Sequence, residues 1–258
     1  MFKRLAAWCA VLAVPVFLLL AMPARAAETV DVELVLAVDI SGSIDSYEFD
    51  LQRKGYSKAF LDPRVMDAIR ANQLQRIAVT MVEWSGNENQ EQIVPWMLVK
   101  DAASAMAFAE AVLKPGRGPG RRTSISGGID FSMRLFENSP YAGQRRVIDV
   151  SGDGANNSGR PAEAARDDAV KAGVTINGLA ILNDRPNPGG FGGFGYGAEW
   201  TGPLDEYYAD KVIGGVGSFM ISVNDFEAFE RAVVQKLVRE IAGIIVTPAN
   251  GPAGLAAP

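Results

Sequence analysis

The chain has 258 residues, of which 48% are hydrophobic and 21% charged, so it has ample apolar sequence for the core of a globular domain. It contains no histidine and a single cysteine, Cys9. The absence of histidine excludes histidine-dependent catalytic triads, histidine acid–base catalysis and most zinc sites. The formal charge of -5, without a run of basic residues, argues against nucleic acid as a partner.

The first 26 residues are typical of a secretory signal peptide. Lys3 and Arg4 give a basic start, an apolar run covers residues 5–21, and Ala-Arg-Ala at 24–26 matches the small-x-small rule of signal peptidase. The apolar run is short for a membrane span, although an uncleaved anchor is the alternative interpretation. We therefore expect cleavage after Ala26 or a neighbouring residue.

Cleavage there removes three basic residues and no acidic one, which moves the formal charge from -5 to -8. It also removes Cys9, so the mature chain has no thiol or disulfide. No second apolar run is long enough to span a membrane, and we expect no stable membrane insertion after cleavage. These features predict a periplasmic or secreted protein. They do not predict its oligomeric state.

Expected strands and helices alternate along the rest of the chain. The nearly continuous apolar run at 32–38 is typical of a strand covered on both faces. Pro95 cannot donate to a ladder, which favours an edge position for its strand. The expected strands are 32–38, 76–82, 92–99, 146–150, 174–182 and 217–223. The expected helices are 46–60, ending at Asp62-Pro63, and 102–113, 124–136, 161–172 and 225–242.

This alternation predicts a doubly wound α/β sandwich, with a mostly parallel central sheet, one antiparallel edge strand and helices on both faces. One domain at 27–246 accounts for all the elements. Residues 183–207 form an insertion rich in glycine and aromatic residues, and 247–258 form a flexible tail. The insertion contains Gly-x-Gly-x-x-Gly at 190–195, but this motif does not join a first strand to its helix, so a surface loop is favoured over a nucleotide site.

Oxygen-bearing side chains follow two of the expected strands. Asp39, Ser41 and Ser43 come after the first strand, Thr123 precedes a helix, and Asp153 follows the strand at 146–150. Ligands of open α/β sheets bind beyond the carboxyl ends of the strands, so we expect these side chains to share one edge. Hydroxyl and carboxylate oxygens suit Mg²⁺ or Mn²⁺.

An apolar strand leading into Asp-x-Ser-x-Ser, a distant Thr before a helix, and Asp-Gly after a later strand resemble the von Willebrand factor A (vWA, integrin I-like) domain. The resemblance covers residues 30–243, and the chain looks similar to an uncharacterised bacterial family of secreted vWA-like proteins. It implies a metal-ion-dependent adhesion site (MIDAS) held by Ser41, Ser43, Thr123, Asp39 and Asp153, the two carboxylates acting directly or through water. It further implies that a carboxylate of a protein partner binds the cation and that the protein is not an enzyme.

Other interpretations of the same residues remain open. A metal-dependent hydrolase or phosphatase would use Asp39 or Ser41 as its nucleophile, but neither a histidine nor a lysine is present in the loop to activate it. A calcium loop starting at Asp149 would need a closing glutamate where Arg160 stands. A structural domain with a vestigial site, or a metal-free capped turn, is also possible. Basic residues before Thr123 either attract an acidic partner or are simply solvated: Arg117, Arg121 and Arg122.

Overall fold

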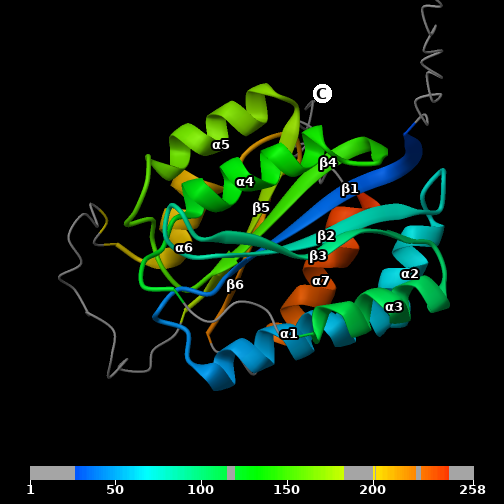
Figure 1. Ribbon diagram of the computed structural model, residues 1–258, viewed down its shortest axis with the longest axis horizontal. Coiled ribbons are helices and arrows are strands. Elements are labelled where there is room, and N and C mark those ends of the chain that lie inside the picture. The colour runs from blue at the N-terminus through cyan, green and yellow to red at the C-terminus, as the bar shows by residue number, and fades with distance from the viewer. Residues whose placement is uncertain (1–26, 115–119, 183–199, 201, 225–227, 244–258) are drawn as a thin grey trace, which may run out of the picture.

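Strand β1 (Glu28–Asp39) lies inside a six-stranded sheet in the computed structural model (Figure 1). The structure describes residues 27–114, 120–182, 200, 202–224 and 228–243. The strand order is β3-β2-β1-β4-β5-β6; β2 and β3 are antiparallel, and the other neighbouring pairs are parallel. The remaining strands are β2 (Ile77–Trp84), β3 (Gln90–Val99), β4 (Tyr141–Gly152), β5 (Val174–Ile181) and β6 (Met220–Val223).

Helices cover both faces of this sheet (Figure 1). One face packs against α1 (Ser46–Leu61), α2 (Pro63–Arg70), α3 (Ala102–Val112) and α7 (Phe229–Ala242). The other packs against α4 (Ile125–Glu137), α5 (Ala162–Lys171), α6 (Leu204–Tyr207) and the π-helical turn η1 (Tyr208–Val212).

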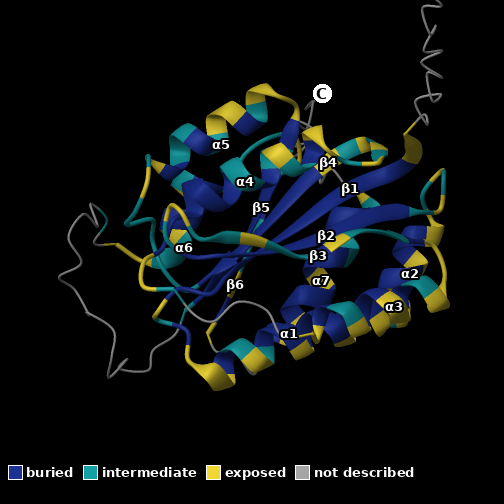
Figure 2. Cartoon of the chain, in the orientation of Figure 1, coloured by how far each residue is buried: buried dark blue, intermediate teal, exposed yellow. Residues whose placement is uncertain are grey.

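The side chains of β1 alternate between the two cores, as the period of two in a strand requires. Leu34 and Leu36 enter the core under α1 and α7, whereas Val35 and Ala37 enter the core under α4 and α5. Both faces of the central strands are therefore buried, and Figure 2 shows them in dark blue. This arrangement explains why the apolar run of β1 is continuous rather than alternating.

The predicted fold class is confirmed: the sheet is mostly parallel, with an antiparallel edge strand that carries Pro95. Two helical segments were missed. The prediction that Asp62-Pro63 only ends a helix was incomplete, because the Asp62 side chain accepts from the Arg64 amide at 2.9 Å and caps α2 at once. The helical residues 204–212 were not expected as an element at all.

Strand β4 is longer than the predicted 146–150, because its polar first half pairs with the start of β1 through backbone groups and carries no apolar signal. The predicted signal peptide at 1–26, the glycine-rich motif at 190–195 and the tail at 247–258 lie outside the described residues. Within the described part of the chain, no helix is long and apolar enough to cross a membrane.

A buried ionic cluster joins α7 to β4 and β5. Lys236 Nζ contacts a carboxylate oxygen of Asp149 and lies 2.7 Å from Oε1 of Glu240. Asn177 donates to the same Glu240 oxygen at 2.9 Å, and all four side chains are buried. Burial raises the pKa of Glu240 to about 7; the Asp149 charge also raises it, and Lys236 lowers it. The lysine therefore compensates two carboxyl groups that water cannot reach.

Replacing Lys236 with methionine should lower the free energy of unfolding by about 3 to 5 kcal/mol, because it leaves two buried carboxyl groups without their cation. Denaturant unfolding followed by circular dichroism measures this loss. The matched control is Lys58→Met, which removes a 2.8 Å ion pair with Glu230 on the exposed surface and should cost less than about 1 kcal/mol. Similar small losses in both variants would contradict the compensating role of Lys236.

Candidate functional site

The site begins where β1 ends. Asp39 is the last residue of β1 and is fully buried, and the next amide, of Ile40, still donates to the Trp84 carbonyl of β2 at 2.8 Å. The chain then turns, and the Ser41 amide donates to Oδ1 of Asp39 at 2.7 Å. This turn aims the Asp39 carboxylate and the Ser41 hydroxyl at the same rim of the sheet.

Hydrogen bonds connect the hydroxyls of this turn to Asp153. The Ser41 and Ser43 hydroxyl oxygens are 3.1 Å apart, and Ser43 donates to Oδ1 of Asp153 at 2.6 Å. Asp153 directly follows β4, which pairs in parallel with β1. The structure therefore brings these four predicted site residues together.

Thr123 joins the group through the loop that follows Asp153. The Thr123 amide donates to Oδ1 of Asn157 at 2.9 Å, and the Asn157 amide donates to the Thr123 carbonyl at 2.8 Å. The Thr123 hydroxyl lies 3.5 Å from where a Cβ on Gly154 would stand. Next to it, the side chain of Asn156 accepts from the Ser126 amide at 3.1 Å. The paired asparagines after β4 thus hold the start of α4 against the Asp153 turn.

A close backbone approach ties the loop before α4 to the turn after β1. The Gly120 amide donates to the Ile40 carbonyl at 2.9 Å, and a Cβ on Gly42 would stand only 3.0 Å from the Gly120 carbonyl oxygen. A side chain at residue 42 would push the two loops apart. The described part of the basic loop before Thr123 includes Arg121 and Arg122, and both are exposed.

The two carboxyl groups of the site resist ionisation. Burial raises the pKa of Asp39 well above its usual value, the Asp153 charge raises it further, and hydrogen bonds from Ser41 lower it. Burial also raises the pKa of Asp153, to about 6, even though the hydrogen bond from Ser43 lowers it. A bound cation would favour the charged form of both groups.

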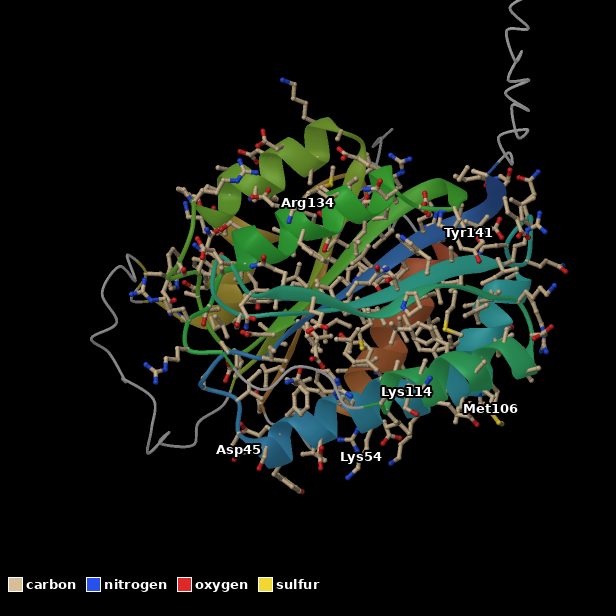
Figure 3. The ribbon with its side chains drawn as sticks, in the orientation of Figure 1. Asp45, Lys54, Met106, Lys114, Arg134 and Tyr141 are labelled. Carbon is tan, nitrogen blue, oxygen red and sulfur yellow. The ribbon has the colours of Figure 1, made fainter. Side chains whose placement is uncertain are left out.

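Glu48 is a third acid near the site, and it is not among the predicted site residues. It lies in the first turn of α1 and is buried, and its negative charge raises the pKa of Asp153. Its carboxylate also accepts from the Asp45 amide at 3.0 Å, in a reciprocal cap; Figure 3 labels Asp45 at the amino end of α1. The sequence signal for Glu48 was its position in the first turn of a helix that starts just after the Asp-x-Ser-x-Ser motif.

A metal ion at this rim would need hydroxyl ligands in addition to carboxylates. The described residues contain no group of three or more His, Cys, Asp or Glu side chains placed to hold a metal ion. Asp149 belongs to the ionic cluster under α7, so the arrangement gives no support to the calcium-loop alternative. The hydroxyl of Ser41 has another hydroxyl as its hydrogen-bond partner, which is not a base that would activate it.

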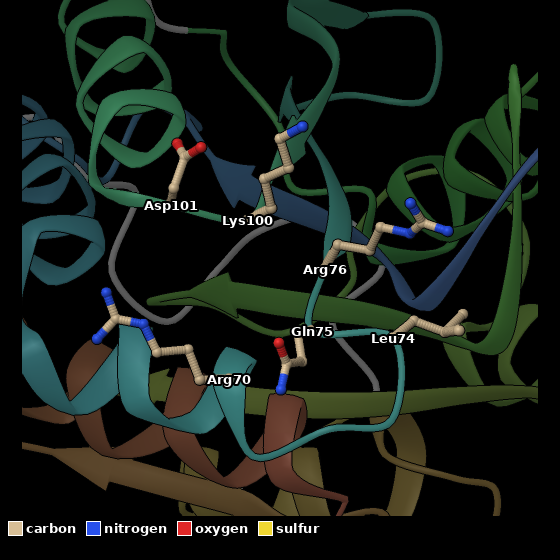
Figure 4. Close-up of a pocket in the computed structure, with 6 residues that line it drawn as sticks. All are labelled: Arg70, Leu74, Gln75, Arg76, Lys100 and Asp101. Atoms are coloured by element: carbon tan, nitrogen blue, oxygen red, sulfur yellow. The ribbon is translucent and has the colours of Figure 1, made fainter.

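An open hollow lies away from this rim. A cavity of about 440 Å³ lies beside the start of β2 and the end of β3, which is the opposite end of the sheet from Asp39 (Figure 4). It is open and polar, and its lining residues are Arg70, Leu74, Gln75, Arg76, Lys100 and Asp101. None of the predicted site residues contributes to it.

A known family matches most of the chain. The sequence profile of the family described as "Protein of unknown function (DUF1194)" matches residues 29–245. No curated protein matches the chain.

Several solved structures share the fold. Proximal thread matrix protein 1 (PTMP1) of the mussel byssus is 17% identical, with a TM-score of 0.55 over 84% of this chain and 47% of its own, and another PTMP1 structure has a zinc-occupied MIDAS motif. A von Willebrand factor type A protein from Catenulispora acidiphila is 16% identical, with a TM-score of 0.53 over 83% and 42%. The pilus adhesin SpaC of Lactobacillus rhamnosus GG is 13% identical, with a TM-score of 0.52 over 83% and 30%. The chain spans less than half the length of each, and the similarity confirms a vWA-like fold.

Asn157→Ala should destabilise the site locally, because it removes the acceptor of the Thr123 amide and leaves that amide unpaired. We expect a loss of about 1 to 2 kcal/mol in the free energy of unfolding and faster hydrogen exchange at Thr123. Asn138→Ala is the control: its side chain donates to the Arg134 carbonyl on the exposed end of α4, and its loss should not change exchange at Thr123. Unchanged exchange in Asn157→Ala would show that the asparagine does not hold this loop.

Proposed function

The chain belongs to the DUF1194 family, and we propose that it is an exported, metal-dependent protein-interaction domain that binds an acidic group of a protein partner through a divalent cation. The observation that carries the proposal is the chain of hydrogen bonds from Asp39 through Ser41 and Ser43 to Asp153. Thr123 lies beside this chain. The proposed ligands are the three hydroxyls and two carboxylates of this group.

The donor chemistry fits a hard cation. Oδ2 of Asp39 is buried and has no hydrogen-bond partner among the described residues, so it is free to accept from a cation or its water shell. The charge of Asp153 makes ionisation of Asp39 unfavourable, and a divalent ion would remove that conflict. Neutral hydroxyl ligands and few carboxylates suit Mg²⁺ or Mn²⁺, which keep several waters.

A cation held in this way would attract an anion. Two carboxylates neutralise its formal charge, but hydroxyl and water ligands leave it electrophilic enough to bind one more carboxylate. PTMP1 is named a matrix protein and SpaC a pilus adhesin, which agrees with binding rather than catalysis as the role of the fold. Exposed Arg121 and Arg122 would assist an acidic partner electrostatically. Export to the periplasm or beyond rests on the predicted signal peptide at 1–26.

Replacing either carboxylate should remove metal binding without unfolding the domain. We expect Asp39→Asn and Asp153→Asn each to weaken Mg²⁺ binding by more than about 100-fold. Loss of a residue that only supports a ligand typically weakens metal binding by about 10- to 100-fold, and loss of a ligand itself should weaken it more. Isothermal titration calorimetry with Mg²⁺ alone measures the affinity. Asp50→Asn is the control, since Asp50 lies exposed on α1 and pairs only weakly with Lys54 at 4.0 Å. Metal affinity equal to wild type in both site variants would refute the site.

The partner should require the same groups. Wild-type protein with Mg²⁺ should retain a partner from extracellular or periplasmic extract, and the retained protein should be lost with EDTA and with Asp39→Asn. This outcome follows because the partner carboxylate would bind the cation rather than the protein surface. A partner held equally under all three conditions would show that recognition does not pass through the metal.

Metal affinity should fall as the pH is lowered through about 6. In the metal-free protein the pKa of Asp153 is about 6 and that of Asp39 is also raised, so below these values Mg²⁺ must displace protons that the carboxyl groups hold. We expect binding at pH 5 to be at least about 10-fold weaker than at pH 7, with proton release. Titrations in two buffers of different ionisation enthalpy measure both effects. A pH-independent affinity with no proton release would argue against carboxylate ligands.

A further inference from the structure

Tyr208 lies directly behind the candidate metal site. It is the first residue of η1, it is fully buried, and it packs in the core under α4 and α5. Its ring lies close over β5, because a Cβ on Gly178 would stand 2.9 Å from its Cδ1 atom. From there the side chain extends towards the end of β4. A π-helical turn at this place is notable because such turns are frequent at functional sites.

The Tyr208 hydroxyl and the Asp39 carboxylate meet at Gly152. A Cβ on Gly152 would stand 2.8 Å from the hydroxyl oxygen of Tyr208 and 2.9 Å from Oδ2 of Asp39. Both atoms therefore lie within 3 Å of one point, which is left free because residue 152 is a glycine without a side chain. Each atom is buried, and neither has a hydrogen-bond partner among the described residues.

These two orphan atoms are complementary. A carboxylate oxygen only accepts hydrogen bonds, and a tyrosine hydroxyl can donate one. Buried polar groups without a partner cost free energy, and one water shared by the two atoms would remove that cost.

We propose that Tyr208 is a positioning residue for the metal site: its hydroxyl donates a hydrogen bond, through one water, to one lone pair of Asp39 Oδ2, and so orients the carboxylate with its other lone pair toward the cation. This inference rests on the proposed function. Carboxylate ligands of metal sites are commonly oriented by such outer hydrogen bonds, and loss of one typically weakens metal binding by about 10- to 100-fold.

The helical residues 204–212 also contact the loop that follows β4. Tyr207, the preceding residue, accepts a hydrogen bond from the Asn156 amide at 3.3 Å, and its ring packs edge-on against Trp200 and Tyr208. Two consecutive tyrosines therefore support both the Asp39 side and the Asn156 side of the rim. This placement gives the helical residues 204–212 a role that packing alone would not require.

The test compares Tyr208→Phe with a matched control on the opposite face of the sheet. Tyr56→Phe removes another fully buried hydroxyl, one that donates to Ser151 at 3.2 Å under α1. Both variants keep the ring, and thermal unfolding without metal establishes that both are folded. Titration with Mg²⁺ alone then gives the affinity, and tyrosine ultraviolet difference spectra report whether Mg²⁺ perturbs a buried tyrosine.

We expect Tyr208→Phe to weaken Mg²⁺ binding by about 10-fold and to abolish a metal-induced tyrosine signal that Tyr56→Phe retains. A purely structural tyrosine would alter the melting temperature but not the affinity. Unchanged affinity in a Tyr208→Phe protein, when wild type binds Mg²⁺, would overturn this inference and leave the proposed function intact. If wild type itself binds no Mg²⁺, the proposed function fails and the role of Tyr208 fails with it.

Discussion

The rest of the structure depends on the double pairing of β1. This strand bonds to β2 on one side and to β4 on the other, and both of its faces are covered by helices. A slip of one residue in register would turn every apolar side chain to the wrong core. Asp39, the last residue of the strand, therefore has a position that two parallel ladders determine, and β4 brings Asp153 to the same edge.

The two groups of acids in this protein differ in what compensates their charge. Under α7, Lys236 supplies a cation for Asp149 and Glu240. At the strand ends, the groups that ease ionisation of Asp39 and Asp153 are hydroxyls and backbone amides, which are weaker than an ammonium ion. Acid pairs of this kind are common at functional sites, because either a proton or a bound cation must compensate their charge.

Three loops form the rim, and each is held by the others. The turn after β1 bonds to Gly120, Thr123 bonds to Asn157, and the helical turn that carries Tyr208 closes the site from below. A rim built in this way holds its side chains at the ends of rigid strands. Preorganised oxygen donors of this kind bind a cation without first having to order a loop.

The sequence by itself determined the alternation of strands and helices, the edge position of the strand with Pro95, and the oxygen-rich turns after β1 and β4. These are encoded in local patterns: apolar runs, caps and turn residues adjacent in the chain. Only the tertiary structure decided that Ser43 bonds to Asp153, 110 positions away, that Asn157 holds Thr123, and that a tyrosine lies behind Asp39. No local pattern predicts such contacts, because they arise when separately folded elements pack on the sheet and bring distant side chains to one point.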